Sequence, residues 1–113
     1  MLVSFVLLDQ YAEWEAAYLA SALTSFGHAV QTVSPRGEPV RSMGGFTLLP
    51  GGGLDAVPPE AAGLVLIGGL SWRGGAAGPV APLVRQVRDR GGVVAAICDA
   101  AGFLGTLGRW DNA

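Results

Sequence analysis

Residues 93–104 read VVAAICDAAGFL, and this stretch decides how the chain folds. The almost wholly apolar run at its start predicts a buried strand, and the small residues at its end predict a short helix. The single cysteine, Cys98, falls between the two. A sharp strand-to-helix turn holds a nucleophile in a strained backbone conformation, and Ala96 and Ala100, two residues away on either side, leave the room that such a turn needs. The stretch therefore predicts an α/β fold with a candidate nucleophile at a strand end.

The rest of the chain alternates short apolar runs with amphipathic segments, which is typical of a parallel sheet with helices on both faces. The pattern predicts strands at 2–8, 28–33, 63–67 and 93–97, and helices at 12–26, 79–90 and 100–107. Two short β-rich runs, 40–42 and 46–49, flank Gly44-Gly45 and predict a small hairpin outside the main sheet. We expect an open, flavodoxin-like parallel sheet with helices on both faces and a β-hairpin excursion.

Composition narrows the classes of protein and of partner. Of the 113 residues, 50% are apolar and 14% are charged, which excludes a disordered chain and suits a single domain. The net charge is −2 and the arginines are scattered, so neither nucleic acid nor a membrane surface is an expected partner. No apolar run approaches the roughly 18 residues of a membrane span. One cysteine and one histidine offer neither a disulfide nor a metal site, so we expect a cytoplasmic protein without metal or cofactor.

Two interpretations of Cys98 remain open at the level of its neighbours. The start of the following helix favours an anion and can lower the pKa of a thiol, which makes a reactive thiolate plausible. Asp99 acts in the opposite direction, because a carboxylate beside a thiol disfavours the thiolate. The alternative is that Cys98 is only a small apolar residue at the end of a buried strand.

Three segments resemble the ThiJ/PfpI superfamily, relatives of the class I glutamine amidotransferases. Residues 95–104, AAICDAAGFL, resemble its nucleophile elbow. Residues 9–16, DQYAEWEA, resemble the segment that carries its acidic residue, and residues 68–72, GGLSW, resemble its glycine-pair loop. The three occur in the family's order over nearly the whole chain, and they are most similar to the type 1 glutamine amidotransferase-like subgroup.

The resemblance implies a flavodoxin-like, usually dimeric domain in which a protonated glutamate from the first helix is hydrogen-bonded to the cysteine. The matching position here is Glu15. Glu15 also lies at helical spacing with Ala12 and Leu19 and interrupts an apolar face, so we expect it to be partly buried, where a carboxyl tends to stay protonated. The alternative role for Glu15 is a first-turn carboxylate that complements the helix dipole.

The glycine-pair loop offers candidate binding groups. Without Cβ atoms at Gly68 and Gly69, the amides of Gly69 and Leu70 can approach a substrate and stabilise a developing oxyanion, with the amide of Asp99 as a second donor. The alternative is a tight turn of the kind that every β-α connection needs. Trp72 either forms a wall of the pocket or packs in the core.

One departure from the family limits the chemistry. Many members have a histidine directly after the cysteine or further along, but here that position is Asp99, and the sole histidine is His28. A Cys-His-acid hydrolase therefore cannot be assembled from these residues alone. Two hypotheses remain: a cysteine-dependent hydrolase, glyoxalase or deglycase-type enzyme, that is, a hydrolase or lyase acting on a small molecule, or a non-catalytic redox-sensing or stress-response binding protein.

We also expect residues 1–113 to form a single ThiJ/PfpI-like domain that is incomplete at its C-terminus. The family's domain continues past the elbow helix, whereas this chain stops shortly after it, at residues 108–113. The strand at 93–97 is apolar enough to be central, yet few helices remain to cover both of its faces. A second copy of the chain or a missing C-terminal segment would supply the cover.

Overall fold

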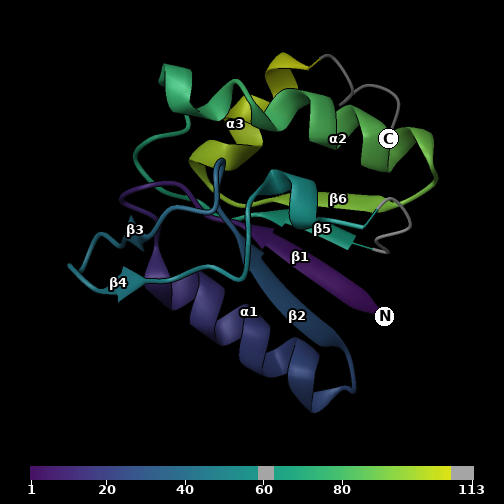
Figure 1. The fold of residues 1–113 in the computed structure, drawn as a ribbon, viewed down its shortest axis with the longest axis horizontal. Helices are drawn as coiled ribbons and strands as arrows, with labels where there is room; N and C mark the ends of the chain where they lie inside the picture. Colours follow the sequence, from purple (N-terminus) through teal and green to yellow (C-terminus); the bar gives the residue numbers. More distant parts are fainter. Residues whose placement is uncertain (59–62, 108–113) are drawn as a thin grey trace.

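A computed structural model describes residues 1–58 and 63–107 (Figure 1). Gly108, which the sequence predicts as the end of the last helix, and the residues after it lie outside the described part. Among the described residues, no helix is long and apolar enough to cross a membrane. The elements are β1 (Leu2–Val6), α1 (Glu13–Ser25), β2 (Ala29–Val33), β3 (Val40–Arg41), β4 (Thr47–Leu48), η1 (Leu54–Ala56), β5 (Gly63–Leu66), η2 (Gly75–Ala77), α2 (Val80–Asp89), β6 (Val93–Ala96) and α3 (Asp99–Thr106).

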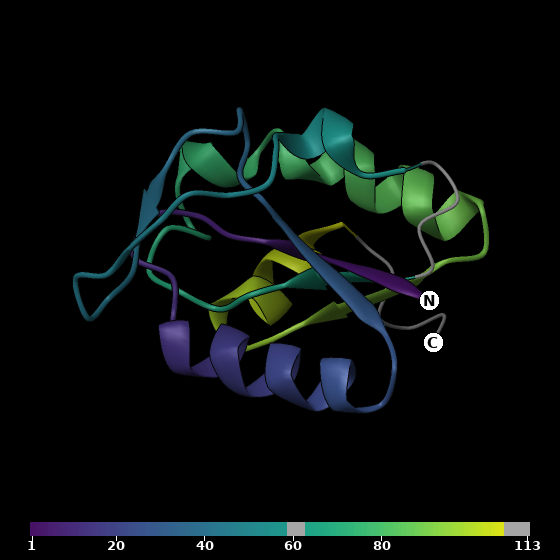
Figure 2. The ribbon, with the colours of Figure 1, turned by 60° about the horizontal axis from the view of Figure 1, so that its bottom comes forward.

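The main sheet is parallel, and its strand order is β2-β1-β5-β6. This order confirms the flavodoxin-like topology, because the chain builds outward from β1 in one direction and then in the other. Figures 1 and 2 show α1 on one face of the sheet and α2 with α3 on the other. The predicted hairpin is also present, as the antiparallel pair β3-β4 beside the main sheet.

Alternate residues of each buried strand face the two helical layers, as the period-2 geometry of a strand requires. On one side, Val6, Leu64 and Leu66 pack in a core with the buried residues of α2 and α3. On the other side, Phe5 and Leu7 belong to a second core, against which α1 packs. The carboxyl ends of all four strands lie at one edge of the sheet, where the α/β topology places ligand sites.

The strand predicted at 93–97 has the composition of a central strand, but β6 is the last strand of the described sheet. Val93 is 64% exposed on the face where α1 lies, which agrees with the expectation that these residues leave one face of the strand without cover. The helix predicted at 12–26 ends one residue early, at Ser25, and the side chain of Phe26 is 80% exposed. Phe26 occupies the C-cap, where the chain leaves helical geometry and then turns at Gly27, with φ of 88°.

Candidate functional site

Cys98 is the residue at which β6 turns into α3. It is the N-cap of α3, with φ of 54° and ψ of −125°, a backbone conformation that non-glycine residues rarely adopt. Ala100 is fully buried behind it, so a larger side chain at that position would have no space. The strained turn agrees with the prediction made from the elbow pattern, and it leaves the Cys98 side chain exposed at the carboxyl edge of the sheet.

Glu15 lies beside the cysteine. The Cys98 thiol donates a hydrogen bond to Glu15 Oε2 across 3.2 Å, and the Gly68 N–H donates to Glu15 Oε1 across 3.1 Å. Each carboxyl oxygen therefore has a separate donor, one from the elbow and one from the end of the neighbouring strand. The predicted proximity of Glu15 and Cys98 is confirmed, although the two residues are 83 positions apart in the chain.

The glycine pair is explained by close packing of backbones. A Cβ atom on Gly68 would lie 2.7 Å from Glu15 Oε1 and 2.8 Å from the Ile97 carbonyl oxygen. A Cβ atom on Gly69 would lie 2.6 Å from the Gln10 carbonyl oxygen. All three distances are below 3.0 Å, a separation that real Cβ atoms essentially never show, so glycine is strongly favoured at both positions.

The expected oxyanion donors are only partly available. The Leu70 N–H donates to the Gln10 carbonyl across 3.2 Å, so the prediction that it is free for a substrate is wrong. The loop folds back against residues 10–12, and this contact occupies the Leu70 amide that the sequence analysis offered as an oxyanion donor. Asp99 is the first residue of α3, and first-turn amides have no partner within their own helix, so its N–H remains a candidate donor next to the sulfur.

The electrostatics of the site favour the protonated thiol. The hydrogen bond to Glu15 and the charge of Glu15 raise the pKa of Cys98 above its usual value, and partial burial and the charge of Asp99 raise it further. The sequence suggested two opposite effects on the pKa of the thiol: the start of α3 would lower it and the Asp99 carboxylate would raise it. In the structure the pKa is raised, so the carboxylates have the larger effect. A nucleophilic attack by this thiol therefore requires that its proton be removed as the sulfur reacts, and Glu15 is in place to accept it.

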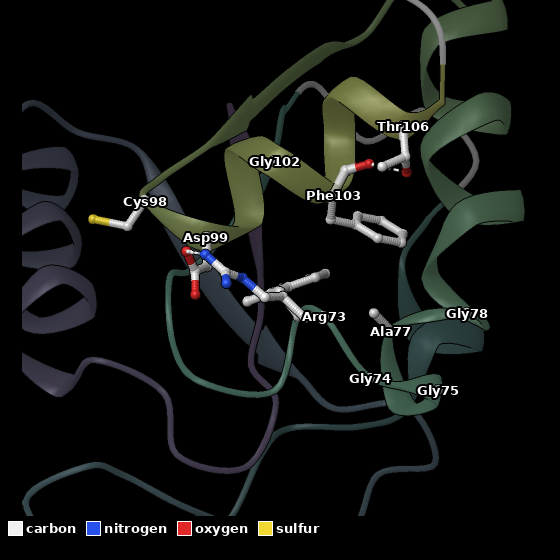
Figure 3. Close-up of a pocket in the computed structure, with 11 residues that line it drawn as sticks. Arg73, Gly74, Gly75, Ala77, Gly78, Cys98, Asp99, Gly102, Phe103 and Thr106 are labelled. Carbon is white, nitrogen blue, oxygen red and sulfur yellow. Dashed lines mark hydrogen bonds and ion pairs between the residues drawn. The ribbon is translucent and has the colours of Figure 1, made fainter.

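Cys98 lies at one end of a pocket of about 640 Å³, drawn in Figure 3. The floor contains Phe103 and Trp72, whose rings are 5.2 Å apart between centroids. Trp72 is 3% exposed and donates its indole N–H to the Ile67 carbonyl, so it packs in the core while also lining the pocket. Figure 3 shows the Cys98 sulfur directed away from Phe103 and Thr106.

Two charged contacts near the site were not anticipated from the sequence. Arg73, from the loop after β5, lies 3.2 Å from the Asp99 carboxylate and forms an ion pair with it. Glu13 is half-buried, and its Oε2 accepts hydrogen bonds from the Ser42 hydroxyl and from the Gly44 N–H, the latter at 2.9 Å. The only hint in the sequence is that Glu13 stands one turn before apolar positions of the helix. Its hydrogen-bond partners come from a distant hairpin, so local sequence does not identify them.

No histidine lies beside the cysteine in the described residues. His28 precedes β2 at the amino edge of the parallel sheet, whereas Cys98 follows β6 at the carboxyl edge. No group of three or more histidine, cysteine or acidic side chains in the described ranges could hold a metal ion. The chemistry that these residues offer is that of a thiol, the neighbouring carboxylates of Glu15 and Asp99, and backbone amides.

Comparison with known proteins places this geometry in a family. The model of the DJ-1/PfpI family matches residues 1–112. The "Uncharacterized protease YdeA" of Bacillus subtilis (strain 168) is 38% identical over 110 residues, which cover 96% of this chain and 54% of that protein. A DJ-1 superfamily protein from Agrobacterium tumefaciens has a crystal structure similar to this one, with a TM-score of 0.88 and 41% identity over 96% of this chain and 58% of the other.

Drosophila melanogaster DJ-1beta is similar at a TM-score of 0.83 and 29% identity, over 95% of this chain and 60% of its own. The chain thus spans a little more than half the length of these relatives. Since the family match and the first two relatives extend over nearly all of its residues, the chain belongs to the DJ-1/PfpI family.

Proposed function

We propose that Cys98 and Glu15 form the centre of a cysteine-dependent enzyme that acts on small reactive carbonyl compounds. The observation that carries this proposal is the 3.2 Å hydrogen bond between the Cys98 thiol and the Glu15 carboxylate at a strained, exposed elbow. A thiol paired with a carboxylate can add to an aldehyde without a histidine, because the carboxylate accepts the thiol proton during the attack.

The proposed first step is addition. The Cys98 sulfur bonds to the carbonyl carbon, the π electrons of the carbonyl move to its oxygen, and the thiol proton passes through Glu15 to that oxygen, which gives a hemithioacetal. With a 2-oxoaldehyde, Glu15 would then move a proton between the two oxygenated carbons, and water would hydrolyse the resulting thioester to a 2-hydroxy acid. The Asp99 N–H would stabilise the oxyanion. No outside oxidant or reductant is needed.

The test is turnover of methylglyoxal to lactate by purified chain of verified mass. Cys98→Ser should reduce turnover to background, and Glu15→Gln should reduce it roughly a hundredfold, the usual contribution of a general base. Asp89→Asn, at the exposed end of α2 and the opposite edge of the fold, should leave turnover unchanged. A folded wild-type chain that turns over neither methylglyoxal nor glycated thiols would contradict the proposal.

A second candidate function is redox sensing. It is favoured by the exposure of Cys98, because peroxide oxidises accessible thiols and the products differ in charge and size. Peroxide titration followed by intact mass separates the two. If peroxide adds oxygen atoms stoichiometrically to Cys98 and the chain shows no turnover, the redox role and a stress response are favoured. Turnover of a carbonyl substrate favours the enzyme.

We propose further that this domain acts in the cytoplasm and that additional polypeptide covers the exposed face of β6. A lone exposed thiol remains reduced in a reducing compartment. Val93 and Ala95 lie uncovered on the face where α1 packs, and the relatives are nearly twice as long as this chain. The cover is either a second copy, giving a homodimer, or a C-terminal segment. Light scattering with size-exclusion chromatography distinguishes them, and a stable, cooperatively folding monomer of these residues alone would contradict both.

A further inference from the structure

The ion pair between Arg73 and Asp99 is a feature of the site that the proposed chemistry does not use. Arg73 is in the loop that follows β5, and Asp99 is the residue directly after Cys98. Arg73 Nη2 lies 3.2 Å from Asp99 Oδ1. The side chain of Arg73 is 83% exposed and that of Asp99 is 36% exposed, so the pair is open to solvent and can break and re-form readily.

The geometry separates the Asp99 carboxylate from the thiol. Figure 3 shows the Asp99 carboxylate beside the Arg73 guanidinium, while the Cys98 sulfur points away from both. Without Arg73, the Asp99 side chain would be free to sample its other staggered rotamers, including any that bring the carboxylate closer to the sulfur. The ion pair therefore favours the Asp99 rotamer that keeps the carboxylate on the pocket side of the elbow, even though the pair can open.

The charge balance gives this position a chemical consequence. Glu15 from α1 and Asp99 from α3 are the charged groups that raise the pKa of Cys98, with Glu15 the larger cause. Arg73, from the loop after β5, places a positive charge beside Asp99, the carboxylate with the smaller effect on the pKa of Cys98. Without the Arg73 charge, the Asp99 carboxylate would disfavour the Cys98 thiolate more strongly.

We propose that Arg73 is a positioning residue that maintains the reactivity of Cys98 by holding the Asp99 carboxylate on the pocket side of the elbow. The proposal rests on the proposed function only in taking Cys98 as the reacting group. It concerns the thiol itself, so it can be tested by alkylation, separately from turnover of any substrate.

The experiment measures the rate of alkylation by iodoacetamide against pH, a reaction in which the thiolate sulfur displaces iodide. Arg73→Met should shift the profile to higher pH and slow alkylation at neutral pH by about twofold to threefold, the scale of an exposed ion pair. Asp99→Asn should shift the profile to lower pH. Because Arg73 acts through Asp99, Arg73→Met should have no further effect in the Asp99→Asn background.

Two controls separate this role from a general effect of charge. Arg73→Lys should restore most of the rate, and Arg85→Met, an exposed arginine on α2, should leave the profile unchanged. High salt should weaken the effect of Arg73→Met. An unchanged profile in Arg73→Met, an equal shift in the Asp99→Asn background, or an equal shift in Arg85→Met would each overturn the proposal. If alkylation follows these expectations while turnover is absent, the proposed enzyme fails and this inference stands.

Discussion

The two faces of the sheet are covered by helices that are held in different ways. α2 buries Val80, Leu83, Val84 and Val87 in the core of its face. α1 is longer, yet none of its residues is fully buried. The carboxylates of its first turn make polar contacts with other elements. Glu13 accepts hydrogen bonds from the hairpin, and Glu15 accepts them from the Cys98 thiol and the Gly68 amide. α2 is thus held mainly by apolar burial, whereas the start of α1 is held by polar contacts that bring the Glu15 carboxylate beside Cys98.

Gly68→Ala should produce the largest effect, because Gly68 joins the two regions. The added Cβ would meet the backbone carbonyl of Ile97 at 2.8 Å and the Glu15 carboxylate at 2.7 Å, so the elbow or the loop must shift. We expect a loss of about 3 kcal/mol in the free energy of unfolding, as for other overpacked sites, together with altered Cys98 alkylation. Gly102→Ala, at a helical position where a Cβ meets nothing within 4 Å, should not destabilise the fold. Similar denaturation midpoints for the two variants would contradict the assigned role of Gly68.

Paired valine truncations measure the difference between the faces directly. Val84→Ala removes buried methyl groups from the α2 face and should lower the free energy of unfolding by about 2 kcal/mol. Val93→Ala removes a side chain that is 64% exposed on the other face and should cost less than about 0.5 kcal/mol. Urea denaturation of both variants tests this. An equal cost at Val93 would show that its face is covered in solution.

Glu13→Gln should have the smallest effect on stability, and the effect should depend on pH. The hydrogen bond from Ser42, with help from the Gly44 amide, lowers the pKa of Glu13 in the folded chain. A lowered pKa gives stability that is present above the unfolded pKa and is lost as pH falls through the folded one. The wild type should therefore lose more stability on acidification than Glu13→Gln does, as measured by thermal melts over acidic pH. Parallel acid profiles would show that Glu13 does not contribute through its charge.

The sequence was informative where local chemistry determines the structure. The strained backbone of Cys98 and the short helix that follows it were predicted from short-range patterns, and the structure shows both. The need for glycine at 68 and 69 has a different origin, because Glu15, Ile97 and Gln10 approach these positions from distant parts of the chain. The position of Glu15 followed from helical spacing together with the family resemblance.

The errors concern contacts between distant segments. The Leu70 amide is engaged by Gln10, and the Asp99 carboxylate by Arg73, through loops whose paths the sequence does not encode locally. The apolar composition of β6 suits a central strand, but composition alone does not determine which segments cover the two faces of a strand. Ser42 as the partner of Glu13 was beyond prediction for the same reason, since 29 residues separate them.

The central claim is that Glu15 controls the proton of Cys98, and a pH titration of the thiol tests it most directly. Thiolate absorbance in the ultraviolet, with Cys98→Ser as the blank, gives the pKa of Cys98 in the wild type and in Glu15→Gln. Since the hydrogen bond and charge of Glu15 raise this pKa, the account predicts that Glu15→Gln lowers it and speeds alkylation near neutral pH while methylglyoxal turnover falls. A pKa that is unchanged or higher in Glu15→Gln would contradict the account.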